Sequence, residues 1–155
     1  MVFFDVENSS RCDHVASVLA HLGLPDGDRH TKVIATGNWR VVSAETARLL
    51  AHAGAELIHS APILGVKDWS DLRIAVDAGR WLGTAQAADV LEIVSDDRAF
   101  DAVGDVAATL GVLFRRVSHR SLARHCASPS RSTRSTAGRP RRRRECRRPP
   151  SGDTD

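Results

Sequence analysis

The chain has 155 residues, of which 42% are hydrophobic, and this is enough for one domain with a buried core. Its formal charge of +3 is unevenly distributed, because residues 1–126 carry a net charge of −3 and residues 127–155 carry +6. Three scattered cysteines exclude a disulfide framework and a cysteine-based zinc site, and the lack of a signal peptide and of a long apolar run predicts a cytoplasmic protein without a membrane segment.

Strands and helices are expected to alternate along the first 126 residues. Short apolar runs predict strands at residues 2–4, 32–36, 56–60, 90–94 and 112–117. Apolar residues at helical spacing predict helices near residues 15–22, 44–53, 70–82 and 98–110, and a short one near 121–126. This alternation is typical of a parallel sheet covered on both faces, so we expect an α/β fold with three layers, α/β/α, around five parallel strands.

The apolar residues of the two later long helices predict which of their faces are buried. In the helix at 70–82, the inward residues should be Leu72, Ala75, Val76, Gly79 and Leu82. In the helix at 98–110, they should be Phe100, Val103, Val106 and Ala107.

The character of the chain changes after this domain, which we place at residues 1–126. Residues 127–155 are rich in Ser, Thr, Pro, Gly and Arg and hold almost nothing apolar, so they are expected to form a disordered basic tail. The densest run of charge there, a candidate nucleic-acid-binding segment, comprises Arg139, Arg141, Arg142, Arg143 and Arg144. Such a run predicts salt-sensitive binding to phosphates without sequence preference.

Acidic residues stand at three separate strand-to-helix junctions. Asp5 ends the first strand, Asp97 follows the fourth, and Asp71 opens the third long helix. Parallel strands end at one edge of a sheet, and the first and fourth can be neighbours where the strand order reverses. Asp101 lies one helical turn after Asp97. One aspartate alone is more often a helix cap or a solvated charge, but several at one edge need a cation such as Mg²⁺ or Mn²⁺ to offset their repulsion.

These acids belong to three longer motifs. They are Asp5-Val-Glu-Asn8 after an apolar strand, Lys67 followed four residues later by Asp71, and Ser95-Asp-Asp-Arg-Ala-Phe-Asp101 after another strand. In this order and spacing, over about residues 1–120, they resemble the NYN branch of the PIN-like nuclease superfamily. The third motif departs from the common form of that branch, which has an acid at the position of Ala99 and a glycine at that of Asp96.

The resemblance implies a PIN-like fold and a role for each matching residue. It implies metal binding by Asp5, Asp71, Asp97 and Asp101, with Asn8 orienting a water or a phosphate oxygen among the catalytic residues. Lys67 would meet the scissile phosphate as a point charge. Asp77, where many relatives also have an acid, is equally well explained by a structural role.

These patterns lead to the hypothesis of a metal-dependent (Mg²⁺ or Mn²⁺) endoribonuclease that hydrolyses phosphodiester bonds in RNA. The alternative is a module of the same fold that binds nucleic acid without cleaving it, which the departure at Ala99 favours. A response-regulator receiver is disfavoured because the third strand does not end in an aspartate, and a haloacid-dehalogenase-like phosphatase because Glu7 stands where it needs a second aspartate. An oligomer is compatible with the sequence.

Overall fold

The computed structural model describes residues 1–8, 10–24, 31–62, 66–120 and 122. The strands are β1 (Val2–Asp5), β2 (Val33–Gly37), β3 (Glu56–His59), β4 (Val90–Val94) and β5 (Leu113–Val117). The helices are α1 (Cys12–Leu22), α2 (Ala44–His52), α3 (Trp69–Leu82) and α4 (Asp101–Thr109), with a 3-10 turn, η1 (Arg98–Phe100), before α4. The expected helix near residues 121–126 and the tail fall almost entirely outside the described residues. No described helix has the length and apolar character that crossing a bilayer requires.

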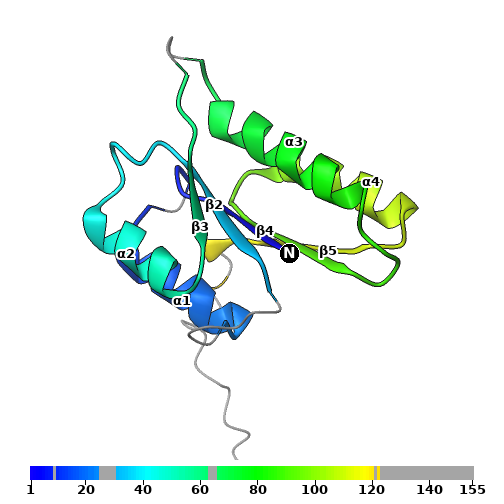
Figure 1. Cartoon of the computed structure of the whole chain (residues 1–155), viewed down its shortest axis with the longest axis horizontal. Coiled ribbons are helices and arrows are strands. Elements are labelled where there is room, and N and C mark those ends of the chain that lie inside the picture. Colours follow the sequence, from blue (N-terminus) through cyan, green and yellow to red (C-terminus); the bar gives the residue numbers. More distant parts are fainter. Residues whose placement is uncertain (9, 25–30, 63–65, 121, 123–155) are drawn as a thin grey trace, which may run out of the picture.

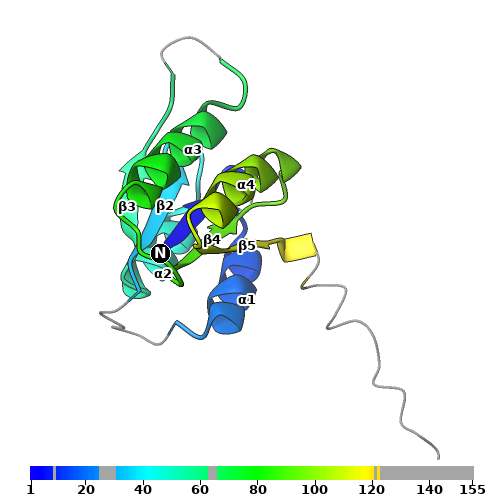
Figure 2. The ribbon, with the colours of Figure 1, turned by 90° about the vertical axis from the view of Figure 1, so that its right-hand side faces the viewer.

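The five strands form one parallel sheet in the order β3-β2-β1-β4-β5. Helices α1 and α2 lie on one face of this sheet, and α3 and α4 lie on the other (Figures 1 and 2). The expected α/β architecture with five parallel strands between two helical layers is therefore confirmed. The chain order reverses between β1 and β4, which is where ligands bind in open sheets of this kind.

The core follows from the position of β1 at the centre of the sheet. All four residues of β1 are buried, and its alternating side chains enter the two layers in turn. Phe4 packs with the α1 side of the core, and Phe3 packs with the α3 side. A continuous apolar run is what a strand covered on both faces requires, and this explains why the chain opens with three apolar residues.

Local signals set the ends of the helices on the α1 side. Gly23 ends α1 in the left-handed conformation, with φ of 61°, which favours glycine because it lacks a Cβ. Ser43 caps α2 by accepting a hydrogen bond from the Thr46 amide nitrogen at 3.1 Å. Both boundaries agree with those predicted from the sequence.

The predicted buried face of α3 is wrong at most positions, although Leu82 is buried as expected. The buried residues are Ser70, Ile74, Ala78 and Leu82, spaced four apart, whereas Leu72 and Val76 are 58% and 61% exposed. Apolar side chains occur on two opposite sides of this helix, so periodicity alone favoured the wrong one. The small residues at positions 70 and 78 allow the helix to lie close to the sheet. Val106 of α4, predicted inward, is also exposed, while Phe100 and Ala107 are buried as expected.

Gly104 provides a test of the packing between α4 and β5. A Cβ added at this position would collide with the ring of Phe114 on β5. Because well-packed interiors tolerate added volume poorly, Gly104→Ala should lower the free energy of unfolding by about 1–3 kcal/mol. Urea unfolding followed by circular dichroism would measure the change. Gly79→Ala in α3, where an added Cβ meets nothing within 4 Å, is the matched control and should not destabilise the protein.

Candidate active site

The register of the central strands brings the ends of β1 and β4 together. Phe4 lies beside Val94 in the sheet, so the next residues, Asp5 and Ser95, are neighbours although 90 positions separate them. The Ser95 hydroxyl donates a hydrogen bond of 2.9 Å to Oδ2 of Asp5. Both side chains are almost completely buried, and they form the base of the candidate site at the carboxyl edge of the sheet.

The Asp5 carboxylate is held in one orientation by four hydrogen bonds. Its Oδ1 accepts from the amide nitrogens of Glu7 and Asn8, at 3.1 and 3.4 Å. Its Oδ2 accepts from Ser95 and, at 2.6 Å, from the side-chain amide of Asn8. A buried carboxylate needs such donors to offset its lost hydration, and here they also fix the direction of its lone pairs.

Two further residues hold the carboxylates in place. The Asn8 amide group donates to Asp5 and, at 3.3 Å, to Ser95, so it positions the Asp5 carboxylate, and its role toward a water or a phosphate oxygen stays a prediction. Ser95 was not among the candidate residues, yet its hydroxyl also accepts from the Asp97 amide nitrogen at 3.1 Å. Its place at the start of the third motif, directly after a buried strand, was the sequence signal for it.

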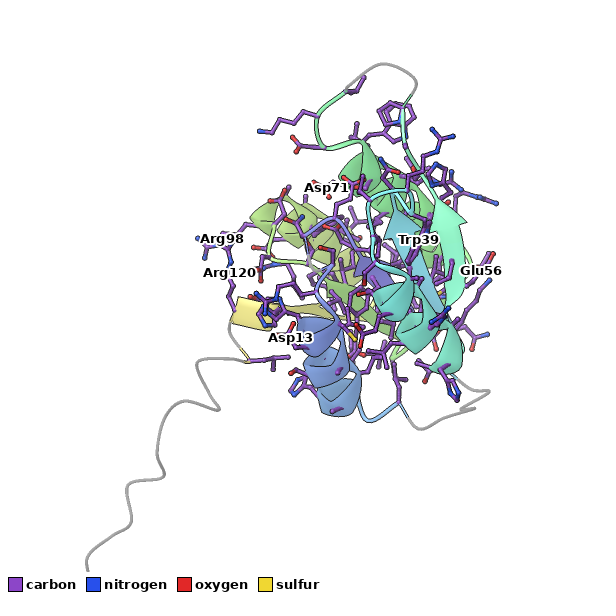
Figure 3. The ribbon with its side chains drawn as sticks, turned by 90° about the vertical axis from the view of Figure 1, so that its left-hand side faces the viewer. Asp13, Trp39, Glu56, Asp71, Arg98 and Arg120 are labelled. Carbon is purple, nitrogen blue, oxygen red and sulfur yellow. The ribbon has the colours of Figure 1, made fainter. Side chains whose placement is uncertain are left out.

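Asp71 lies on the first turn of α3 (Figure 3) and is the acid most affected by its neighbours. Burial raises its pKa to about 7, and the nearby Asp5 charge, a hydrogen bond to Asp5 and the Asp97 charge add to the effect. These causes place the three carboxyl groups in one electrostatic cluster, which we call the acidic cluster (Asp5, Asp71 and Asp97). Acids from three separate strand-to-helix junctions therefore meet at the switch point of the sheet.

Asp97 and Asp101 also make contacts of their own. Asp97 caps η1, because its Oδ1 accepts from the Ala99 amide nitrogen at 2.9 Å. Asp101, at the start of α4, pairs with Arg116 of β5 at 2.8 Å, and the same guanidinium donates to the Ser95 carbonyl at 3.3 Å. Asp101 is thus linked through Arg116 to the backbone of Ser95, and its role as a metal ligand stays a prediction.

The remaining candidates lie at different places. The ammonium of Lys67 is highly exposed and lies 3.9 Å from Asp68, beside the start of α3. Asp77 faces away from the acidic cluster and pairs with Arg73 and Arg80 of its own helix, which supports the structural role. The predicted nucleic-acid-binding arginines at positions 139 and 141–144 lie outside the described residues.

The chemistry of the acidic cluster suits a divalent cation, although its arrangement is not that of a formed metal site. Within the part of the chain that the structure describes, no three His, Cys, Asp or Glu side chains are placed to hold a metal ion as they stand. The donors themselves are carboxylate oxygens, which Mg²⁺ and Mn²⁺ prefer. Burial is the largest cause of the raised pKa of Asp71, and the negative charges of Asp5 and Asp97 contribute repulsion that a cation would relieve.

A hollow of about 280 Å³ lies between the loops that follow β1 and β2. Its lining includes Val6, Glu7, Ser10, Asn38, Val41 and Val42, and none of the three acids of the cluster. The Asn38 amide nitrogen donates to Glu7 at 3.2 Å and joins the two loops.

No protein-family model matches the sequence, and no curated protein matches it significantly. The function therefore has to be argued from the acidic cluster and its surroundings.

The raised pKa of Asp71 predicts a pH-dependent effect on stability. The pKa of Asp71 is about 7 in the folded protein and near 4 in the unfolded chain. Such an acid makes the protein less stable as the pH rises from about 4 to about 7. Asp71→Asn, which can still donate to Asp5, should therefore stabilise the protein increasingly from pH 4 to pH 7 and then by a constant amount. Because Asp71 is only partly buried and solvent screens its charge, we expect less than about 1 kcal/mol at pH 8.

Urea unfolding in EDTA at pH 5, 6, 7 and 8 would measure this difference. Asp105→Asn, on the exposed side of α4, removes the same charge elsewhere and is the control. A stabilisation by Asp71→Asn that did not change with pH would contradict the assigned cause.

Proposed function

We propose that the protein is a metal-dependent endoribonuclease of the NYN/PIN-like type, which hydrolyses phosphodiester bonds in RNA. The observation that carries the proposal is the meeting of Asp5, Asp71 and Asp97 at the switch point, with the pKa of Asp71 raised to about 7. Three neighbouring acids without a cation between them lower the stability of the folded protein. A role in binding a cation for catalysis would explain why these acids are present.

In this mechanism Asp5, Asp71 and Asp97 would hold Mg²⁺ or Mn²⁺, and Asp101 would complete the set or position the attacking water. When bound there, such an ion would supply Lewis-acid chemistry for phosphodiester hydrolysis, namely polarisation of a phosphoryl oxygen and a lowered pKa of the attacking water. Ser95 and Asn8 keep the Asp5 carboxylate aligned through the bonds described above. Lys67, exposed beside the start of α3, would meet the negative charge of the RNA backbone.

The arginine-rich tail would supply affinity that the domain lacks. Residues 1–126 carry a net charge of −3, which repels RNA, whereas residues 127–155 carry +6. Arginines neutralise phosphates without reading the bases, so the tail would bring many RNA sequences to the acidic cluster. RNA is accordingly the partner that we propose.

A non-cleaving nucleic-acid-binding module is the second candidate. Two observations favour it: Ala99 replaces an acid common in the NYN branch, and Asp101 is engaged by Arg116. Such a module would bind RNA through the tail and use the acidic cluster for no chemistry.

Incubating the purified full chain with labelled RNA separates these candidates. The nuclease should cut the RNA internally with Mg²⁺ or Mn²⁺ and stop when EDTA is added, since hydrolysis depends on the bound ion. Intact RNA with both metals, together with retained RNA binding, would support the non-cleaving module.

A further inference from the structure

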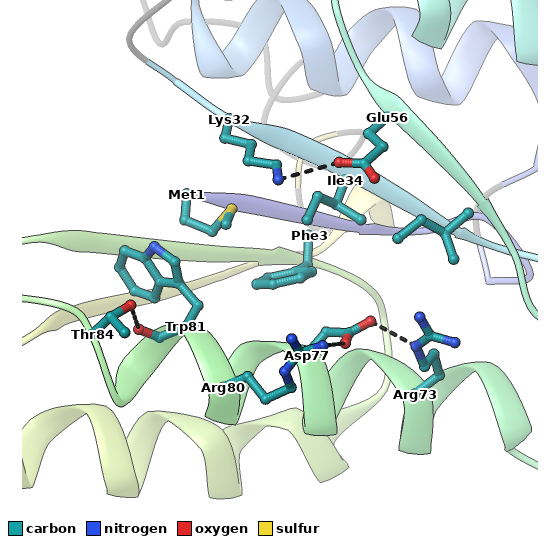
Figure 4. Close-up of a pocket in the computed structure, with 11 residues that line it drawn as sticks. Met1, Phe3, Lys32, Ile34, Glu56, Arg73, Asp77, Arg80, Trp81 and Thr84 are labelled. Atoms are coloured by element: carbon teal, nitrogen blue, oxygen red, sulfur yellow. Dashed lines mark hydrogen bonds and ion pairs between the residues drawn. The ribbon is translucent and has the colours of Figure 1, made fainter.

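A second cavity lies along α3 between Arg73 and Thr84, includes none of the acidic cluster and takes no part in the proposed hydrolysis. It is a groove of about 460 Å³ between α3 and the open face of the sheet (Figure 4). It exists because α3 packs over β1 and β2, which leaves the same face of the edge strand β3 less covered. Its size falls in the range of small-molecule pockets.

The floor and one wall of this groove are apolar. Its apolar lining comprises Phe3 of β1, Ile34 of β2, Ile58 of β3 and Trp81 of α3. Phe3 and Ile34 belong to the core and are 1% and 7% exposed, so they form the fixed base of the floor, whereas Ile58 and Trp81 are partly exposed. A flat, weakly polar ring could lie against Ile58 and the indole of Trp81 with favourable apolar and aromatic contacts.

Charged residues surround the groove, with one more cation than anions. Lys32 pairs with Glu56 at 3.2 Å. Asp77 is shared by Arg73, at 2.7 Å, and Arg80, at 3.5 Å. Since one carboxylate cannot neutralise two guanidinium groups, the Asp77 cluster keeps a net charge of +1 beside the apolar floor.

Arg80 is the cation best placed to bind a ligand. Its side chain is 79% exposed and its contact with Asp77 is the longer of the two, so it can turn toward an anion while Arg73 continues to neutralise Asp77. The planar guanidinium offers paired donors that match the oxygens of a phosphate.

We propose that this groove binds a nucleoside monophosphate, with the base on the floor beside Trp81 and the phosphate held by Arg80. An aromatic ring and a phosphate on one small molecule satisfy both the apolar floor and the excess positive charge. The groove neither includes nor needs the acidic cluster, so this site is independent of the proposed nuclease activity.

Calorimetric titration of the full chain with AMP tests the site. The buffer should contain EDTA, and salt at 150 mM to weaken binding by the arginine-rich tail. We expect one AMP per chain with a dissociation constant below about 1 mM. Arg80→Gln should weaken binding at least fivefold. Arg48→Gln, which removes an exposed arginine of α2 on the other side of the sheet, should leave it within twofold.

Four additional measurements test which part of AMP the groove binds and whether binding depends on the acidic cluster. Adenosine alone and inorganic phosphate alone should each bind more weakly than AMP, and AMP should shift the indole NMR signal that Trp81→Phe removes. Asp97→Asn should bind AMP normally even if it abolishes RNA cleavage. No binding at 10 mM AMP, equal effects of Arg80→Gln and Arg48→Gln, or adenosine or phosphate binding as tightly as AMP would overturn the proposal.

Discussion

Asp97→Asn should abolish metal-dependent RNA cleavage while leaving the fold intact. Asparagine keeps an oxygen that can accept from the Ala99 amide nitrogen, so the cap of η1 survives. It removes the negative charge that would bind the ion. We expect the cleavage rate to fall by roughly 100-fold or more, since loss of residues that only support metal ligands already costs 10- to 100-fold. Initial rates on labelled RNA with Mn²⁺ in excess would measure it.

Asp105→Asn is the matched control for this variant. It removes the same charge from the exposed surface of α4 and should cleave at the wild-type rate. Equal rates for wild type, Asp97→Asn and Asp105→Asn would indicate a contaminating nuclease and end the assignment of enzymatic activity. Circular dichroism and thermal unfolding would check that both variants fold.

Replacing the four consecutive arginines of the tail with glutamine should weaken RNA binding at least tenfold at 50 mM salt. The positions are Arg141, Arg142, Arg143 and Arg144. Each phosphate neutralised on a single strand contributes about 0.7 to the slope of log affinity against log salt, so this slope should fall by up to about 3. Fluorescence anisotropy of a labelled RNA, titrated at several salt concentrations, gives both values.

The experiment should use the Asp97→Asn background so that the RNA stays intact. Lysine at the same four positions keeps the charge and should retain most of the affinity, since counterion release depends mainly on charge. An unchanged salt slope in the glutamine variant would show that the tail does not contact RNA phosphates.

Most of the fold could be predicted from the sequence because each strand is a short apolar run between polar residues. The fourth strand is the clearest case, since Asp89 and Ser95 flank it and its observed bounds are the predicted ones. The face of α3 could not be predicted. Leu72 was predicted to be buried, but Ile74, which is equally apolar and lies on the opposite side of the helix, is the residue that the sheet covers.

The acidic residues of the candidate site could be proposed from the sequence. The side chains that form hydrogen bonds to them could not. Asp5, Asp71 and Asp97 each stand at a strand-to-helix junction, which topology brings to one edge. The role of Ser95 depends on the pairing of Phe4 with Val94, a register that local sequence does not specify. The inward turn of the Asn8 amide likewise follows from the position of two neighbours, one of them 87 residues away.

The central place of β1 also has a consequence for how the molecule folds. The first strand lies between β2 and β4, and its second neighbour is made only from residues 90–94. During synthesis on a ribosome, β1 therefore cannot complete its pairing until residues 90–94 have been made. Such non-local pairing slows folding relative to helical bundles. The contact between Asp5 and Ser95 should appear in that same late step, so partly folded chains would lack the base of the acidic cluster.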